Sequence, residues 1–248
     1  TGVCLVISPL IALMKDQVQQ LEKRGVNASA IYTGLKEPEI DRILNNCASG
    51  HTQLLYISPE RLASKRFLIG LKTLHVSMLA IDEAHCISQW GFDFRPSYRN
   101  IASIRELFPT IPIIALTASA TPKVQEDIIQ SLQLKKDVKI FKSSFERSNI
   151  SFVVRQHTSK PEKMLEILNK VNGSSIIYTS NRKRTQEIAE FLIKNGISAT
   201  FYHAGLSSDE RSKRQEAWIK NQCRVMCCTN AFGMGIDKPN VRMVIHAD

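Results

Sequence analysis

Two adjacent carboxylates and a histidine form the sharpest chemical signal in the sequence. Asp82 and Glu83 follow directly on the apolar run VSMLAI, and His85 comes two residues after Glu83. Carboxylates at the carboxyl end of a parallel strand lie at the sheet edge where α/β proteins bind ligands. At that edge Asp82 can hold Mg²⁺, usually through water, and Glu83 can deprotonate a water molecule that attacks a phosphate. Acidic residues also favour helix N-termini, and a lone histidine is often a core residue, so the pattern leaves both alternatives open.

An aromatic cluster follows the carboxylates. Trp90, Phe92 and Phe94 alternate with small or polar residues, and Arg95 comes next. In a chain with only 7% aromatic residues, three aromatics within five positions suit stacking on nucleic-acid bases. Such stacking contributes about 1 to 3 kcal/mol per base, and Arg95 could contact a phosphate or a stacked base. The alternative is a small hydrophobic cluster under a loop, but the position beside the carboxylates favours a functional loop.

Two further segments place small and polar residues at predicted strand ends. IPIIALTASATP carries hydroxyl groups on Thr117, Ser119 and Thr121. Thr121, which precedes a proline, is also a typical helix N-cap. In TNAFGMGIDKPNVR, Gly235 and Asp237 belong to a loop that could bring backbone N–H groups near phosphate, although an ordinary turn is the commoner meaning of such a pattern.

Short β-rich runs recur with amphipathic helices between them, which predicts an α/β fold with parallel sheets. The strands expected in a first series are 3–7, 28–32, 53–57, 76–81 and 111–117. A polar stretch at 142–149 precedes a second series at 151–155, 174–179, 198–203, 223–229 and 241–246. Two domains fit this arrangement better than one, and we place them at 1–146 and 147–248.

Charge and cysteine content restrict the class of protein. Lys and Arg number 33 against 23 acidic residues, a formal charge of +10 that favours nucleic acid as a partner, although a merely soluble basic protein has the same charge. The six cysteines match neither a disulfide framework nor a paired CxxC site, so we expect no zinc in this segment and a reducing, intracellular compartment. No apolar run approaches the roughly 20 residues that span a bilayer, so we expect no membrane association.

The order of the motifs resembles that of superfamily 2 helicases, and specifically the RecQ family, essentially from end to end. SPLIALMKDQV (8–18) resembles motif Ia, DEAH (82–85) motif II, QWGFDFRPSYR (89–99) the aromatic-rich loop and TASAT (117–121) motif III. IIYTSNRKRTQEIA (176–189) resembles motif IV, YHAGL (202–206) the motif that follows it and TNAFGMGIDKPNVR (229–242) motif V. DEAH is shared with RNA helicases, but its combination with TASAT and the aromatic-rich loop is specific for RecQ.

The resemblance implies two RecA-like domains that bind ATP and Mg²⁺ and move 3′ to 5′ on single-stranded and partly duplex DNA. By that likeness Asp82 binds Mg²⁺ and Glu83 activates water. Coupling of hydrolysis to DNA is implied for His85, Thr117, Ser119, Thr121, Gly235 and Asp237. Contacts with DNA are implied for Trp90, Phe92, Phe94, Arg95, Ser8, Pro9, Lys15, Asn181, Arg182 and His203.

Several parts of the RecQ pattern fall outside this sequence. None of the eleven glycines is followed by lysine, so no GKS-type P-loop is present, and the arginine finger and the zinc-binding and winged-helix modules are missing too. Both ends interrupt α/β units, so we expect a partial sequence that hydrolyses ATP negligibly, since an arginine finger alone contributes about 10³ to 10⁵ in rate. Two alternatives stay open: a non-catalytic single-stranded DNA-binding or annealing protein derived from a helicase, and an RNA-directed helicase.

Overall fold

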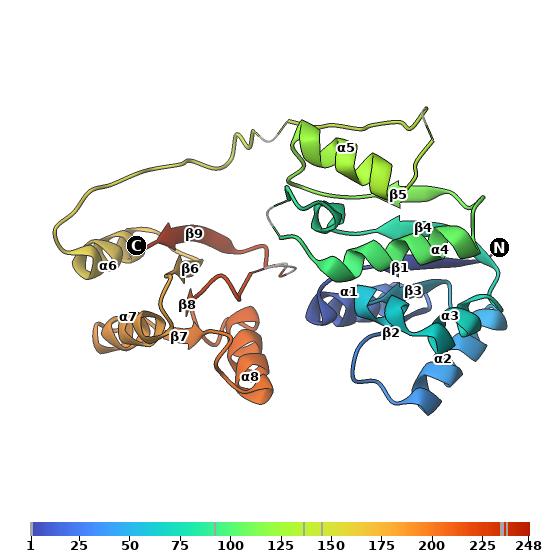
Figure 1. Ribbon diagram of the computed structural model, residues 1–248. Coiled ribbons are helices and arrows are strands. Elements are labelled where there is room, and N and C mark those ends of the chain that lie inside the picture. Colours follow the sequence, from blue (N-terminus) through green and yellow to red (C-terminus); the bar gives the residue numbers. More distant parts are fainter. Residues whose placement is uncertain (1, 92, 136, 145, 234–235, 237) are drawn as a thin grey trace. The chain divides into compact units, whose positions relative to one another are not determined.

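The computed structural model describes residues 2–248 with the exception of 92, 136, 145, 234, 235 and 237. The chain divides into two compact units, one ending at Ser143 and the other beginning at Ser144. Each unit contains a parallel sheet with helices packed on it (Figure 1). The predicted α/β class with parallel sheets is therefore confirmed, whereas the domain limits of 1–146 and 147–248 stay a prediction.

The first unit is built on parallel strands in the order β2-β3-β1-β4-β5. These strands are β1 (Val3–Ile7), β2 (Ala28–Ile31), β3 (Leu54–Ile57), β4 (Val76–Ile81) and β5 (Ile113–Ala115). The α-helices are α1 (Ile11–Lys23), α2 (Glu37–Ala48), α3 (Lys65–Leu71), α4 (Ile101–Leu107) and α5 (Pro122–Ser131). Short 3₁₀ helices occupy Pro59–Ala63, Ala84–Ile87 and Pro96–Asn100.

Alternate side chains of this sheet pack into cores on its two faces, as the period of two along a strand requires. Leu5 and Ile81 belong to the larger core, which also contains residues of α2, α3, α4 and α5. Val6 and Tyr56 lie on the opposite face, where they pack around the fully buried Met14 of α1. Helices on both faces fix the sheet in place, so the carboxyl ends of its strands are held in a defined position.

The second unit repeats this plan with strands in the order β7-β8-β6-β9. Its strands are β6 (Ser174–Tyr178), β7 (Ala199–Tyr202), β8 (Val225–Cys228) and β9 (Val241–His246), and its helices are α6 (Lys160–Lys170), α7 (Arg182–Lys194) and α8 (Ser208–Ile219). Ile177 and Cys227 pack with Met164 of α6 and with α7. On the other face Met226 packs with Trp218 of α8, which is fully buried.

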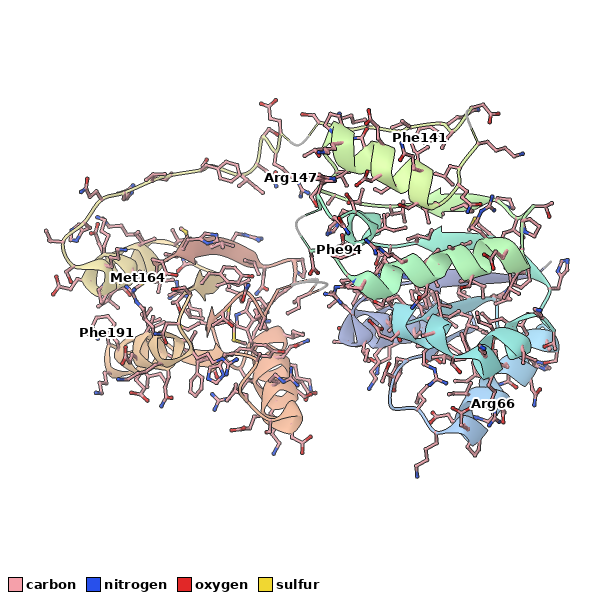
Figure 2. The ribbon with its side chains drawn as sticks, viewed as in Figure 1. Arg66, Phe94, Phe141, Arg147, Met164 and Phe191 are labelled. Atoms are coloured by element: carbon pink, nitrogen blue, oxygen red, sulfur yellow. The ribbon has the colours of Figure 1, made fainter. Side chains whose placement is uncertain are left out.

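One predicted strand is wrong. Residues 151–155 form no strand, and Phe152, Val153 and Val154 in this segment are 92%, 66% and 101% exposed. Phe141, labelled in Figure 2, is also 90% exposed and precedes this segment in the connection between the units. Apolar alternation predicted a strand, but a strand also needs a neighbour for its backbone groups, and no ladder within the described residues includes this segment. The strand predicted at 111–117 is shorter than expected and is limited to β5.

The described part of the chain contains neither a cluster of metal-ligating side chains nor a helix fit to cross a membrane. No three His, Cys, Asp or Glu side chains gather there into a group able to hold a metal ion. All six cysteines are free thiols, and burial raises the pKa of Cys47 to about 11 and that of Cys86 to about 12. None of the helices in these residues has both the length and the apolar character needed to cross a membrane.

Candidate active site

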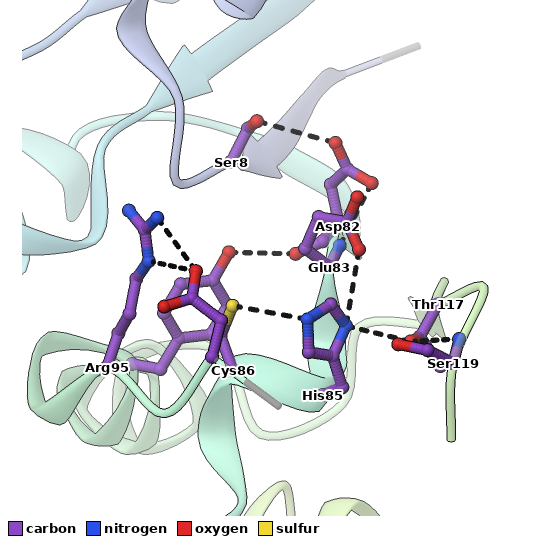
Figure 3. Close-up of polar contacts among 10 residues, drawn as sticks. Ser8, Asp82, Glu83, His85, Cys86, Arg95, Thr117 and Ser119 are labelled. Atoms are coloured by element: carbon purple, nitrogen blue, oxygen red, sulfur yellow. Dashed lines mark hydrogen bonds and ion pairs between the residues drawn. The ribbon is translucent and has the colours of Figure 1, made fainter. Parts of the chain in front are cut away.

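The carboxyl ends of β1 and β4 bring the first chemical groups together. The two strands pair in parallel with Ile7 opposite Ile81, so Ser8 and Asp82 follow side by side. The N–H of Asp82 donates to the carbonyl of Ile7 at 2.8 Å. The Ser8 hydroxyl, which is fully buried, donates to Oδ2 of Asp82 at 3.4 Å (Figure 3). Sheet pairing thus joins the segment resembling motif Ia to the one resembling motif II.

Asp82 is held firmly through its backbone and one of its oxygens. Oδ1 accepts the N–H of Glu83 at 2.9 Å, and the backbone carbonyl accepts the hydroxyl of the buried Tyr98 at 2.8 Å. Among the described residues, Oδ2 accepts only the long hydrogen bond from Ser8, which leaves this oxygen available to a further ligand. Mg²⁺ prefers carboxylate and other hard oxygen ligands and is commonly held by one or two carboxylates plus waters and substrate phosphates. The groups around Asp82 fit such an ion.

Glu83 combines an unusual backbone with a perturbed carboxyl group. Its φ of 47° and ψ of 45° place it in the left-handed region, which is strained for a residue with a side chain. Burial raises the pKa of Glu83, and the negative charges of Asp82 and Asp93 raise it further against the opposing effects of His85 and Arg95. A carboxylate whose pKa is raised toward neutrality is a better proton acceptor in catalysis.

His85 connects Glu83 to the strand that follows. The histidine is buried, and its Nδ1 lies 3.2 Å from Oε2 of Glu83 and 3.0 Å from Oγ1 of Thr117. The N–H of Ser119 donates to the same Thr117 oxygen at 3.3 Å. Figure 3 shows these side chains in a continuous row from Asp82 to Ser119. Glu83, His85, Thr117 and Ser119, which come from two separate motifs, therefore form one contact chain.

The aromatic-rich loop folds back against the row of side chains from Glu83 to Ser119. A Cβ atom on Gly91 would lie 2.3 Å from the carbonyl oxygen of His85, so only glycine permits the close approach. The guanidinium of Arg95 donates to Oδ2 of Asp93 at 3.0 and 2.9 Å and to the carbonyl of Pro9 at 2.9 Å. Arg95, predicted to contact DNA, thus ties the loop to the segment after β1 while its side chain stays 26% exposed.

The aromatic side chains of the loop differ in their surroundings. Trp90 is 64% exposed, and the ammonium of Lys123 lies over its ring. Phe94 is half-buried, and the guanidinium of Arg99 lies 5.3 Å from its ring centroid. Phe92 falls outside the described residues. Sequence reasoning missed both cations and Tyr98, because nothing in their spacing indicates contacts that only folding creates.

Two other predicted residues have structural partners. Thr121 caps α5, since its hydroxyl accepts the N–H of Val124 at 3.4 Å, which confirms the alternative considered for it. Lys15 is exposed on α1, and its ammonium lies 4.8 Å from the ring centroid of Tyr32. A role in DNA binding for Lys15 stays a prediction.

In the second unit the predicted residues gather at the start of α7 and the end of β7. The Asn181 side chain accepts the N–H of Lys183 at 2.8 Å and caps α7, and Arg182 is the first residue of that helix. A Cβ atom on Gly205 would lie 3.0 Å from Nη1 of Arg182 and 3.3 Å from Nδ1 of His203, so both side chains close over this glycine. Gly235 and Asp237 lie outside the described residues.

A parallel sheet that ends in an Asp-Glu pair joined to a histidine is the arrangement expected of nucleotide-hydrolysing α/β proteins. The sequence profile of DEAD/DEAH box helicases matches residues 1–128, and that of the helicase conserved C-terminal domain matches residues 159–248. The chain therefore belongs to the DEAD/DEAH box helicase family.

Several relatives of the chain are RecQ helicases. The chain is 46% identical to the ATP-dependent DNA helicase RecQ of Bacillus subtilis, an alignment that covers 99% of this chain and 42% of the relative. It is 42% identical to RecQ of Pasteurella multocida, with 100% and 39% covered, and 39% identical to the ATP-dependent helicase SGS1 of Saccharomyces cerevisiae, with 99% and 17% covered. The resemblance read from the motifs is confirmed, and the chain spans less than half the length of these relatives.

Solved structures support the fold. The chain superposes on Mycobacterium smegmatis helicase Lhr bound to single-stranded DNA and AMP-PNP with a TM-score of 0.71 at 17% identity, covering 99% of this chain and 36% of the other. For S. cerevisiae Dbp5 bound to RNA and ADP BeF3 the TM-score is 0.71 at 16% identity, with 100% and 63% covered. Both units therefore have the RecA-like fold of helicases.

Proposed function

We propose that the whole protein is an ATP-dependent DNA helicase of the RecQ type, which moves 3′ to 5′ on single-stranded DNA, unwinds duplexes and acts inside the cell in DNA repair and recombination. The observation that carries this proposal is the contact chain Glu83–His85–Thr117 with the aromatic-rich loop packed on it. These contacts connect Glu83, a candidate general base, with a loop that is a candidate surface for stacking of nucleic-acid bases. The names of the RecQ relatives supply the nucleotide and the DNA substrate.

Glu83 is the proposed general base of ATP hydrolysis. Its carboxylate would take the proton of the water that attacks the γ-phosphate, and its raised pKa favours this transfer. Asp82, whose Oδ2 accepts only a long hydrogen bond from Ser8 among the described residues, would hold Mg²⁺, which when bound neutralises charge on the phosphates. The buried Ser8 and Tyr98 keep Asp82 in position, since each donates a hydrogen bond to it.

His85 would transmit the state of this site. When Glu83 accepts a proton, it loses the negative charge that faces Nδ1 of His85 at 3.2 Å. The other contact of Nδ1, with Thr117 at 3.0 Å, then becomes the stronger of the two, and Thr117 also holds the backbone of Ser119. A change in protonation at Glu83 thereby reaches the segment that resembles motif III.

The DNA contacts are proposed for residues around the aromatic-rich loop and, in the second unit, around α7. Trp90 offers a largely exposed ring for base stacking. Ser8, Pro9 and Lys15 in the first unit and Asn181, Arg182 and His203 in the second keep the DNA-path roles that the resemblance implies. Because no phosphate-binding loop is present in these 248 residues, we propose that the chain alone hydrolyses ATP negligibly.

The test uses a chimera in which this chain replaces the matching 248 residues of Bacillus subtilis RecQ. We expect DNA-stimulated ATP hydrolysis and unwinding of a duplex with a 3′ single-stranded tail, but not with a 5′ tail. Glu83→Gln should lower turnover by about 10² to 10⁴, the usual contribution of a general base, whereas Glu106→Gln on the exposed surface of α4 should not. An inactive chimera that still binds single-stranded DNA would favour the annealing protein, and preference for RNA would favour an RNA-directed helicase.

A second measurement addresses the chain by itself. Purified chain without flanking segments should show no DNA-stimulated hydrolysis above that of its Glu83→Gln variant. Turnover that depends on Glu83 in the isolated chain would contradict the proposed need for the absent segments.

A further inference from the structure

Helix α5 holds the ring of Trp90. The ammonium of Lys123 lies 3.1 Å from the centroid of the indole ring, a close cation–π contact. Lys123 is the second residue of α5, and its own side chain is exposed. Because Trp90 is 64% exposed, the lysine covers part of the ring without burying it. One face of the indole is thus engaged, and most of the ring surface stays open to solvent.

The same helix holds the backbone of Trp90. The hydroxyl of Ser88 donates to Oδ2 of Asp127 on α5 at 2.6 Å and accepts the N–H of Trp90 at 3.1 Å. Ser88 is 1% exposed, so these hydrogen bonds are shielded from water. Lys123 and Asp127 are four residues apart and therefore lie on one side of the helix. Backbone and ring of Trp90 are both fixed by adjacent turns of α5.

Fixing an exposed aromatic ring has a consequence for binding. A free indole side chain loses rotational freedom when a base stacks on it, and this loss weakens the complex. A ring already held by a cation on one face avoids that loss and presents its other face for stacking. A lysine beside a stacking ring can also place its positive charge near the phosphate that accompanies a stacked base.

We propose that Lys123 is a positioning and phosphate-binding residue of the nucleic-acid site: it holds Trp90 in the orientation that stacks one base of single-stranded DNA and neutralises the adjacent phosphate. The inference rests on the proposed function and adds a residue of α5 to it. Since α5 begins directly after Thr117–Thr121, occupation of the Trp90 ring also acts on the helix that continues the segment in contact with His85.

The experiment measures binding of a short labelled oligothymidylate to the 248-residue chain by fluorescence anisotropy at several salt concentrations. Lys123→Met keeps the apolar stem and removes the charge, and Lys123→Arg keeps the charge. Lys72→Met is the matched control, because Lys72 is also an exposed lysine. Lys72 lies before the amino end of β4, whereas Trp90 lies beyond the carboxyl end of that strand. Circular dichroism establishes that each variant is folded.

Lys123→Met should weaken binding at low salt by about two- to fivefold, the range expected of an exposed cation–π contact. It should also reduce the slope of log affinity against log salt by about 0.7, the loss of one phosphate contact on a single strand. Lys123→Arg should restore both quantities, and Lys72→Met should change neither. A structural role of Lys123 alone would leave the salt slope unchanged, so an unchanged slope overturns the proposal.

Trp90→Ala separates this inference from the proposed function. If Trp90→Ala weakens binding and Lys123→Met equals Lys72→Met, Lys123 has no role although the stacking loop stands. If Trp90→Ala has no effect either, both the inference and the assignment of this loop to DNA binding are wrong.

Discussion

The left-handed backbone of Glu83 predicts that replacing this residue by glycine stabilises the fold. Glu83 has φ 47° and ψ 45°, whereas glycine adopts such angles without steric cost. Glu83→Gln keeps the strain and removes the charge, while Glu83→Gly removes both. The difference between these two variants therefore isolates the backbone strain from the electrostatics of the site. Gln133, with φ 50° and an exposed side chain after α5, is a matched position without catalytic chemistry.

The magnitude follows from two opposing effects. A left-handed conformation costs a residue with a side chain about 1 to 2 kcal/mol. Glycine loses more conformational freedom on folding, which returns about 0.5 to 1 kcal/mol. The free energy of unfolding of Glu83→Gly should thus exceed that of Glu83→Gln by about 0.5 to 1 kcal/mol. Gln133→Gly should gain a similar amount over the unmodified chain.

Urea unfolding followed by the fluorescence of Trp90 measures these differences. The buried Trp218 of the second unit is replaced by phenylalanine in every protein compared, so that the signal reports the first unit alone. If Glu83→Gly is no more stable than Glu83→Gln while Gln133→Gly gains stability, Glu83 is unstrained in the folded protein. If neither glycine variant gains, the reasoning from backbone angles fails at both positions.

Three further predictions concern the site and the second unit. Because the pKa of Glu83 lies above its ordinary 4.5, hydrolysis by the chimera should fall as the pH drops through that raised pKa. Asp93→Asn removes a negative charge that raises the pKa of Glu83, so this variant should move the acid limb of the pH–rate profile to lower pH. Gly91→Ala should destabilise the first unit by about 1 to 3 kcal/mol through overpacking against His85, measured by urea unfolding. Lys238→Met should destabilise the second unit by about 1 to 3 kcal/mol, seen as a lower Tm, because the carbonyl of Ile219 at the end of α8 and Oδ1 of Asn221 each lose a hydrogen bond.

The sequence predicted the inner strands well because β1, β3, β6 and β8 are buried along most of their length. Such strands consist of nearly continuous apolar runs bounded by polar residues, as VCLVI of β1 and CRVMCCT around β8 illustrate. Residues 151–155 show the limit of this signal, because apolar alternation does not reveal whether a neighbouring strand is present to accept the backbone hydrogen bonds.

The chemistry of the site was predictable in residue type but not in geometry. Asp82, Glu83 and His85 stand together in one motif, and parallel pairing of β1 with β4 adds Ser8. Nothing in the sequence indicates the left-handed backbone angles of Glu83, since glutamate is not a residue that favours them.

Contacts made by single side chains from distant elements were equally invisible. Tyr98 reaches the carbonyl of Asp82 sixteen positions away, and Lys123 reaches Trp90 from a later helix. Each depends on how a helix packs on the sheet, and side-chain spacing along the chain carries no record of that packing.

The strand order also determines when each strand can pair during synthesis on the ribosome. β1 lies inside its sheet, yet its nearest partner along the chain is β3, where Leu54 pairs with Cys4 about fifty residues later. The separation between β6 and its partner β8 is equally long, because Ser175 pairs with Val225. At a synthesis rate of about 5 to 20 residues per second, each apolar strand spends roughly 3 to 10 seconds without its ladder. During translation the nascent chain therefore exposes an unpaired apolar strand once for each sheet, first VCLVI of β1 and later SSIIY of β6, and each is a potential chaperone-binding segment.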